Sequence, residues 1–341
     1  MKILAFSDSH IRDCGSFAPF NVVEENGLTR ELNNILAGFE FVAGQIIKTK
    51  PKVVFFCGDF FHHRDTVSGT VLHAAGLAIS WIVDACTKVR AKFYMIPGNH
   101  DVYSDLLGIN HLSIINGDET LEVIHDDRNL VIDKFRIGIV QFNSDKSKVM
   151  QSLEKACQES DLIITHLDFE GATYETGIAS KSVISPILPI PVISGDIHAY
   201  QILSSVHYIG SLVQNRFNRS DFDKVGGVLI YDTVTKKFEH QPNTRSKHYI
   251  KVEKLDQLKA IGPEQAVFQI RCPVDDDDLN KLSEEGYEFV YIPFLDKGEE
   301  QQQGVILDDM ESPEKILRKH LEKIKPESLT VFDRIMGISN Q

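Results

Sequence analysis

The sequence predicts an α/β fold in which a two-layered β-sandwich is flanked by helices. In about the first hundred residues, short apolar runs of strand type alternate with segments of helical spacing, a pattern typical of sheets with parallel strands. From about residue 120 the pattern changes to short strands, which fits two sheets better than one doubly wound sheet. At 341 residues the chain is long enough for this domain and an appendage.

The predicted elements of this domain follow from apolar periodicity. Apolar residues take helical spacing after Thr29, a residue type that caps helices, and this spacing stops at Pro51. Short apolar runs bounded by polar residues and glycine indicate strands. The predicted helices cover residues 29–50, 69–88 and 146–158, and the predicted strands cover residues 2–7, 52–57, 92–97, 136–141, 161–165, 191–194, 203–209 and 225–240.

The chain is predicted to have four parts. Residues 1–244 form the sandwich domain, and residues 245–295 form a small α/β capping domain. Residues 296–311 are polar and low in complexity, which is typical of a linker. Residues 312–341 hold two short amphipathic segments, a helical tail that either folds back on the main body or docks on a partner protein. The run 275–278, all aspartate, fits the first turn of a helix, and the alternative is a metal cluster.

The composition excludes several classes of protein. The formal net charge of −13 argues against nucleic-acid binding through a broad basic face, although carboxylates that hold metal ions add to such a count. No uninterrupted apolar run reaches about 18 residues, and the N-terminus reads as a strand rather than a signal peptide. We therefore expect a cytoplasmic protein without a membrane span. Five scattered cysteines with no C-x-x-C pair disfavour a disulfide framework and a structural zinc site.

Chemically active side chains follow five of the predicted strands. Carboxyl ends of neighbouring parallel strands share one edge of a sheet, so these side chains are expected to converge. Oxygen and nitrogen donors without a thiolate suit Mn²⁺, Mg²⁺ or Fe²⁺ rather than a cysteine-rich zinc site. These donors are enough to bind two metal ions if the carboxylate of Asp59 bridges the two ions. The predicted metal ligands are Asp8, His10, Asp59, Asn99, His166, Asp196 and His198.

The motifs around these residues resemble those of the calcineurin-like metallophosphoesterases over residues 1 to about 240. In chain order they are Asp8-x-His10, Gly58-Asp59, Gly98-Asn99-His100-Asp101, His166 and Gly195-x-x-His198. The resemblance implies the fold of that family and two divalent metal ions. It also implies that one ion is held by Asp8, His10, Asp59 and His198, and the other by Asp59, Asn99, His166 and residue 196.

Position 196 departs from this family, which usually has histidine there. As a hard anionic ligand, Asp196 favours Mn²⁺ or Mg²⁺, and the alternative is that it impairs the second metal site. His100 is the predicted catalytic acid, which either protonates the leaving oxygen or hydrogen-bonds a phosphate oxygen. Asp101 is predicted to orient His100 by accepting its other ring N–H.

Two regions resemble the SbcD-type nucleases, the nuclease subunits of double-strand-break processing complexes. Residues 58–65 are similar to the Gly-Asp-Leu-Phe-His/Asp segment of these enzymes, which places His62 near the scissile phosphate. Residues 195–201 and 208–214 are similar to their closing segment. The predicted DNA-binding residues are Ser211, through its backbone N–H and hydroxyl, and Arg216 and Arg219, through their charge.

The resemblance implies a DNA nuclease with 3′→5′ exonuclease and endonuclease activity in DNA end processing, recombination or repair. It implies two divalent metal ions, Mn²⁺ before Mg²⁺, and a homodimer bound through its tail to an SbcC-like SMC-family ATPase. The chain itself has no Gly-x-x-x-x-Gly-Lys-Ser/Thr phosphate loop. The compact size suggests a bacterial or bacteriophage version, the latter in the host cytoplasm. Two alternatives stay open: a nucleotide or small-molecule phosphodiesterase or phosphatase, and a catalytically weakened scaffold that regulates the ATPase.

Overall fold

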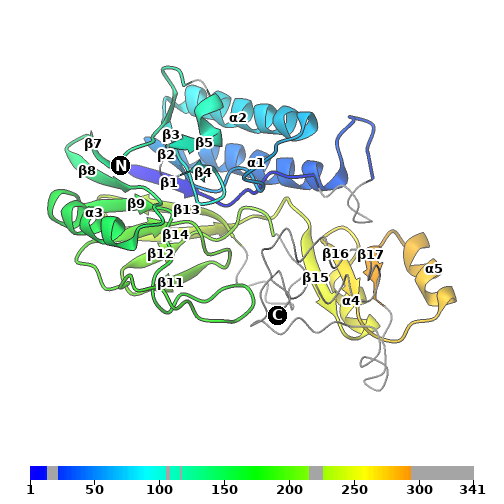
Figure 1. The fold of residues 1–341 in the computed structure, drawn as a ribbon. Coiled ribbons are helices and arrows are strands. Elements are labelled where there is room, and N and C mark those ends of the chain that lie inside the picture. The colour runs from blue at the N-terminus through cyan, green and yellow to red at the C-terminus, as the bar shows by residue number, and fades with distance from the viewer. Residues whose placement is uncertain (14–21, 105–107, 116, 215–225, 293–341) are drawn as a thin grey trace, which may run out of the picture. The chain divides into compact units, whose positions relative to one another are not determined.

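The computed structural model describes residues 1–13, 22–104, 108–115, 117–214 and 226–292. These residues belong to one compact unit, in which two six-stranded sheets face each other and helices cover their outer faces (Figure 1). The predicted fold class, a two-layered β-sandwich flanked by helices, is confirmed. The predicted linker and tail lie outside the described residues.

The first sheet has the opening strand of the chain near its centre. Its order is β14-β13-β1-β2-β3-β6, in which the last four run parallel to one another, and β13 is antiparallel to both of its neighbours, β1 and β14. Its central strands are apolar and buried, as expected of parallel strands covered on both faces. The bounds are β1 Lys2–Phe6, β2 Val53–Cys57, β3 Lys92–Ile96, β6 Leu121–Val123, β13 Gly227–Asp232 and β14 Lys237–Pro242; between β3 and β6 lie the short elements β4 Val102–Ser104, β5 Ile109–Asn110 and η1 His111–Ile114.

The second sheet has four parallel strands flanked by antiparallel edges. Its order is β11-β12-β10-β9-β8-β7, and the edge strands β7 and β11 are the antiparallel ones. Apolar side chains from both sheets meet between them. The bounds are β7 Arg128–Ile132, β8 Phe135–Val140, β9 Leu162–Thr165, β10 Val192–Ser194, β11 Gln201–Leu203 and β12 Val206–Tyr208.

The three helices of the sandwich begin at side chains that cap them. The side-chain oxygens of Thr29, Ser68 and Asp145 accept hydrogen bonds from N–H groups in the first turn that follows each of them. The length and apolar composition of α2 would allow it to cross a membrane, but its apolar face is buried against α1 and the first sheet. The bounds, α1 Arg30–Thr49, α2 Gly69–Val89 and α3 Lys146–Glu159, confirm the predicted helices to within a residue.

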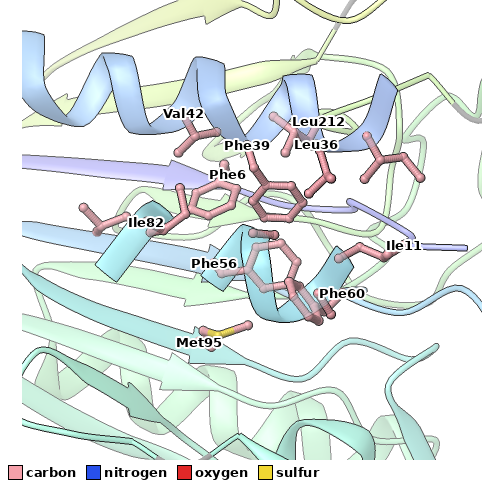
Figure 2. Packing of buried hydrophobic residues seen from close by; sticks show 14 of the residues in the cluster. Phe6, Ile11, Leu36, Phe39, Val42, Phe56, Phe60, Ile82, Met95 and Leu212 are labelled. Carbon is pink, nitrogen blue, oxygen red and sulfur yellow. The ribbon is translucent and has the colours of Figure 1, made fainter. Parts of the chain in front are cut away.

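A phenylalanine cluster between α1 and the first sheet supports the loop that follows β2 (Figure 2). The ring of Phe6 lies 5.2 Å from that of Phe56 and 6.1 Å from that of Phe39, between ring centroids. Phe60, in the loop after β2, lies 5.5 Å from Phe56 and 6.0 Å from Phe39. Such edge-to-face pairs contribute about 0.5–1.5 kcal/mol each beyond their buried area. The loop after β2 is therefore tied to the core through Phe60, the residue that follows Asp59.

A separate three-stranded parallel sheet with its own apolar core follows the sandwich. The side chain of Asp275 accepts the N–H of Asp278 at 2.8 Å and caps α5, so the acidic run is explained by the helix. Side chains of Asn34 and Gln214 hydrogen-bond the backbone at the start of β15. The predicted boundary after residue 244 stays a prediction. The bounds are β15 His248–Val252, α4 Leu255–Ile261, β16 Ala266–Ile270, α5 Asp276–Glu284 and β17 Glu288–Tyr291.

Candidate metal centre

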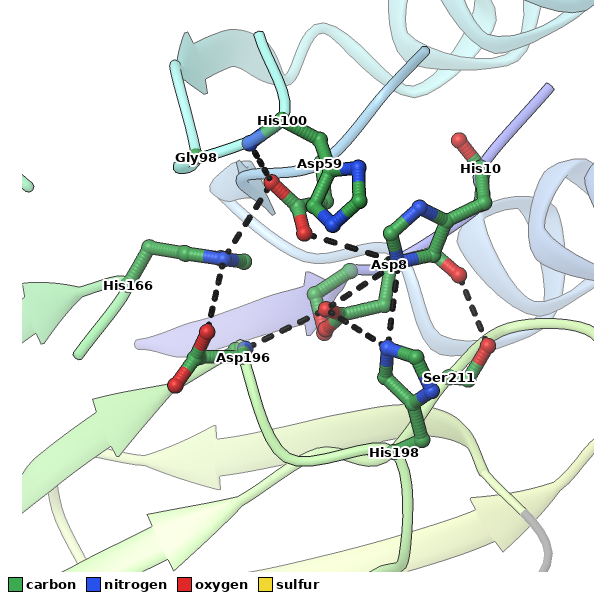
Figure 3. A network of polar contacts seen from close by, with 12 residues as sticks. Asp8, His10, Asp59, Gly98, His100, His166, Asp196, His198 and Ser211 are labelled. Carbon is green, nitrogen blue, oxygen red and sulfur yellow. Dashed lines mark hydrogen bonds and ion pairs between the residues drawn. The ribbon is translucent and has the colours of Figure 1, made fainter. Parts of the chain in front are cut away.

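Five strand ends bring the predicted metal ligands to one edge of the sandwich (Figure 3). β1, β2 and β3 are parallel neighbours in the first sheet, and β9 and β10 are parallel neighbours in the second. Their carboxyl ends therefore share an edge, where α/β sheets bind their ligands. In the order of those strands, the side chains are Asp8 and His10, Asp59, Asn99, His166, and Asp196 and His198.

The loops after β1 and β2 continue side by side beyond the strands. The N–H of Asp8 donates to the carbonyl of Gly58 at 2.9 Å, and the N–H of His10 donates to the carbonyl of Asp59 at 3.0 Å. Asp8, His10, Asp59 and Asp196 all have positive φ, between 42° and 78°. Residues other than glycine are uncommon in this region, and such strained positions gather at functional sites.

Three glycines leave room for the ring of His166. A Cβ on Gly58 would lie 2.3 Å from that ring, and a Cβ on Gly195 would lie 2.6 Å from it. A Cβ on Gly98 would lie 2.2 Å from Oδ1 of Asp59 and 2.8 Å from Nε2 of His166. A glycine therefore accompanies the metal-binding side chains in these motifs because the packed imidazole and carboxylate occupy its side-chain space.

The first group of converging side chains is Asp8, His10, Asp59 and His198. Nε2 of His10 lies 3.0 Å from Nε2 of His198, 3.4 Å from Oδ2 of Asp59 and 4.0 Å from Oδ1 of Asp8. Nε2 of His198 lies 3.8 Å from the same oxygen of Asp8. The ligand atoms of Asp8, His10 and His198 lie close enough together to hold a divalent cation, and Oδ2 of Asp59 lies beside them.

The second group contains Asn99, His166 and Asp196 together with Asp59. Nε2 of His166 lies 3.3 Å from Oδ1 of Asp59, 3.6 Å from Oδ1 of Asp196 and 3.1 Å from Oδ1 of Asn99. Nδ1–H of His166 donates to the carbonyl of Cys57 at 2.7 Å, which leaves Nε2 as its ligand atom. Asp59 turns Oδ2 to the first group and Oδ1 to the second, as the predicted bridge requires.

Two features of these groups fit bound cations. Oδ2 of Asp8 is buried and has no hydrogen-bond partner among the described residues, although such an oxygen is costly to leave unpaired. The side-chain oxygen of Asn99 faces only acceptors, namely Nε2 of His166 and the carboxylate of Asp59. A bound cation would satisfy these acceptors, whereas in its absence the swapped orientation of the Asn99 amide would form hydrogen bonds to His166 and Asp59.

Burial and charge shift the pKa values of these groups in opposite directions. Burial raises the pKa of Asp8. Burial also raises the pKa of Asp196 to about 6; the nearby His166 opposes this shift, and the charge of Asp59 reinforces it. Burial acts to lower the pKa of His166, but the carboxylates around it outweigh burial and raise that pKa. Burial likewise opposes ionisation of Asp59, but His166 holds the pKa of Asp59 well below its usual range. Protons and cations compete for these side chains, so metal affinity falls as the pH falls.

Two further imidazoles, His62 and His100, gather beside the first group. Nδ1 of His62 lies 3.4 Å from Nδ1 of His10, and the rings of His62 and His100 stack with centroids 5.5 Å apart. His100 donates its Nδ1–H to the carbonyl of His62 at 2.7 Å and its backbone N–H to Oδ1 of Asp59 at 2.8 Å. Burial and the charge of Arg12 lower the pKa of His62 to about 3, so its imidazole is neutral at pH 7.

The predicted role of Asp101 is wrong. Among the described residues its carboxylate makes no hydrogen bond to His100, whose Nδ1–H goes to the carbonyl of His62 instead. The carboxylate is fully buried and accepts backbone N–H groups at 2.9–3.1 Å, which fastens the loop after β3 to the loop after β2. Its N–H partners are those of Gly98, Phe60 and Phe61.

The predicted DNA contacts of Ser211 are also wrong. Ser211 is 3% exposed, its N–H donates to the carbonyl of His198 at 2.9 Å, and its hydroxyl donates to the carbonyl of Asp8 at 2.8 Å. Both groups therefore hold the metal-binding segments together and cannot be offered to a phosphate. Arg216 and Arg219 lie outside the described residues.

Two contacts at the site have no signal in the sequence. Oε2 of Glu175 lies 3.5 Å from Nδ1 of His198. Arg12, whose charge acts on His62, forms a buried ion pair at 2.7 Å with Glu31. Each contact joins two different segments of the chain, and neither glutamate follows a predicted strand or belongs to a motif, so local spacing could not reveal them.

Comparisons with known proteins relate part of this chain to one family and to solved structures. Residues 1–162 match the model of the calcineurin-like phosphoesterase family, and no curated protein matches significantly. One crystal structure aligns with a TM-score of 0.42 and 11% identity, over 71% of this chain and 98% of its own. A dimetal phosphatase from Danio rerio aligns with a TM-score of 0.37 and 10% identity, over 67% of this chain and 91% of its own. Residues 1–162 are therefore similar to the calcineurin-like phosphoesterases, and the described histidines and carboxylates form groups that could hold metal ions.

Proposed function

We propose that this protein is a metal-dependent DNA nuclease that hydrolyses phosphodiester bonds, as a 3′→5′ exonuclease and as an endonuclease. The observation that carries the proposal is the pair of imidazoles beside the candidate metal ligands. His62 comes from the segment that resembles SbcD-type nucleases, and its ring stacks on His100 and reaches His10. These two histidines give the site side chains that can contact the substrate, in addition to the side chains that can bind metal ions.

The residues have separable roles in this proposal. When bound, two divalent cations supply an activated water at neutral pH and stabilise negative charge on the phosphate. The Nδ1–H of His100 is engaged by the carbonyl of His62, so Nε2 is the nitrogen that can give a proton to the leaving oxygen. Neutral His62 can hydrogen-bond a phosphate oxygen through its ring N–H without adding positive charge beside the cations. Asp196, a hard carboxylate, suits Mn²⁺ or Mg²⁺, and we propose Mn²⁺ as the first choice.

The proposal includes a partner and a location. Residues 312–341 would dock on an SbcC-like SMC-family ATPase, and the nuclease would act as a homodimer in that complex. The site would work in the cytoplasm, or in the host cytoplasm if the chain comes from a bacteriophage. The amphipathic pattern of residues 312–341 and the absence of a phosphate-loop motif from the sequence support this part of the proposal.

The test is cleavage of linear and plasmid DNA with Mn²⁺, with and without the ATPase, beside a chromogenic phosphodiester. We expect His100→Ala to lower DNA cleavage by about 10²–10⁴-fold, because it removes a general acid, while two Mn²⁺ still bind. His73→Ala, at an exposed histidine of α2, is the matched control and should cleave like the wild type. Cleavage of the chromogenic substrate alone would favour a small-molecule phosphodiesterase instead. Unchanged DNA cleavage by His100→Ala would contradict the assigned role.

A further inference from the structure

A small hairpin places one carboxylate beside the metal centre. Thr173 and Ala179 pair across it, and it closes in a turn in which the N–H of Gly177 donates to the carbonyl of Tyr174 at 2.9 Å. Glu175 is the second residue of that turn. Residues at the tip of such a surface turn normally face water.

Burial at this tip is the reverse of the usual pattern. The side chain of Glu175 is 11% exposed, whereas Ile178, three residues on, is 63% exposed. Glutamate is almost never buried without a partner, and isoleucine is among the residues most often buried. An interaction of the carboxylate must therefore compensate for its burial.

The partner of the carboxylate is His198. Oε2 of Glu175 lies 3.5 Å from Nδ1 of His198, while Nε2 of the same ring faces His10 at 3.0 Å and Asp8 at 3.8 Å. The two nitrogens of this ring are thus divided between the metal-binding group and the hairpin. A histidine that binds a metal through one nitrogen commonly donates its other N–H to a carboxylate, which fixes the tautomer and the ring orientation.

The hairpin is fastened to the segment that carries His198. Gln201 accepts the backbone N–H of Thr173 at 2.9 Å and donates to its carbonyl at 2.8 Å. At the base of the hairpin, Asp168 accepts the hydroxyls of Tyr174 at 2.9 Å and Ser180 at 2.7 Å. Glu175 is consequently held in a fixed place relative to His198 by contacts that do not involve either side chain.

We propose that Glu175 is a positioning residue of the metal centre. It accepts Nδ1–H of His198 and keeps Nε2 directed at the ion held by the first group. This inference rests on the proposed metal-dependent function, because it assigns the ring of His198 to an ion. It adds a residue that lies outside the sequence motifs.

The experiment is a titration of the metal-free protein with Mn²⁺, in which electron paramagnetic resonance counts free and bound ions. We expect two ions in the wild type. Glu175→Ala should raise the dissociation constant of one ion by about 10–100-fold and leave the other unchanged. Glu175→Gln keeps an acceptor for Nδ1–H and should fall between Glu175→Ala and the wild type. Glu170→Ala, at an exposed glutamate just before the hairpin, is the matched control and should bind like the wild type.

A second measurement separates positioning from folding. Thermal unfolding in excess chelator should give the same midpoint for Glu175→Ala as for Glu170→Ala. The proposal is overturned if Glu175→Ala binds both ions like the wild type, if Glu175→Gln is as weak as Glu175→Ala, or if weaker binding comes with a lower midpoint. Two bound Mn²⁺ without any DNA cleavage would refute the nuclease and leave this test intact. A wild type that binds no Mn²⁺ would overturn both.

Discussion

Gly98 has no side chain because Asp59 and His166 occupy the space that a Cβ would need. The nearest atoms to such a Cβ would be Oδ1 of Asp59 at 2.2 Å, the backbone nitrogen of Asp59 at 2.4 Å and Nε2 of His166 at 2.8 Å. Real Cβ atoms essentially never approach other heavy atoms so closely, so a substitution must displace the carboxylate that faces both groups of ligands. Gly98 therefore affects the candidate metal centre only by leaving room for the side chains of Asp59 and His166.

We expect Gly98→Ala to abolish tight binding of Mn²⁺ at both groups, because Asp59 contributes one oxygen to each. Overpacking should also lower the free energy of unfolding by about 1–3 kcal/mol. Isothermal titration with Mn²⁺ and urea denaturation measure the two effects. Gly76→Ala, on the exposed side of α2 with no atom within 4 Å of the added Cβ, is the control. Binding by Gly98→Ala that matches this control would contradict the packing argument.

At the scale of elements, α1 contains two glycines in opposite settings. A Cβ on Gly44 would meet no atom within 4 Å, whereas a Cβ on Gly38 would lie 2.9 Å from Cγ2 of Val213 and 3.2 Å from Nδ2 of Asn243. Glycine in a helix interior costs roughly 0.5–1 kcal/mol relative to alanine. Gly38 therefore lets α1 pack closely on the segments that follow β12 and β14, while Gly44 only weakens the helix.

We expect Gly44→Ala to raise the free energy of unfolding by about 0.5–1 kcal/mol. Gly38→Ala should lower it, since the cost of overpacking, about 1–3 kcal/mol, exceeds the gain in helix propensity. Chemical denaturation of the metal-free protein measures both changes. A gain in stability from Gly38→Ala would show that the neighbours of α1 can move aside, and the close packing inferred for this helix would be wrong.

At the scale of the whole molecule, stacked rings join the two sheets. The ring of His207, on β12, stacks on Phe238, on β14, with centroids 3.7 Å apart. The ring of His240, also on β14, stacks on Tyr200 at 3.8 Å. One ring nitrogen of each histidine is buried without a hydrogen-bond partner among the described residues. Burial lowers the pKa of both to about 4, so the folded protein holds them neutral.

These histidines make stability depend on pH in a defined direction. Their folded pKa of about 4 lies below the value of about 6.5 in an unfolded chain. Their contribution is therefore complete above pH 6.5 and is lost as the pH falls toward 4, because the unfolded chain takes up the protons first. We expect the double variant His207→Phe/His240→Phe to lose less stability between pH 7.5 and pH 5 than the wild type. Urea denaturation in chelator measures this, and His73→Phe, at an exposed histidine, should behave like the wild type.

Much of the fold and the centre of the site could be predicted from local pattern. Helix bounds follow from apolar spacing and capping residues, and strand ends follow from apolar runs that stop at polar motifs. Because neighbouring parallel strands end at one edge, the donors that follow β1, β2, β3, β9 and β10 had to converge if those strands paired in parallel. Asp59 directs one oxygen toward each group, and its bridging of two ions stays a prediction.

The sequence by itself determined the fold class, the helices and the side chains that gather at the edge of the sandwich, since these depend on residues close together in the chain. Only the tertiary structure decided the outer contacts. Asp101 binds backbone N–H groups, Ser211 ties His198 to Asp8, and Glu175 reaches His198 from a distant hairpin. The physical reason is that a side chain forms hydrogen bonds and ion pairs with the residues that the fold brings next to it. Spacing along the chain does not show which residues of other loops these will be.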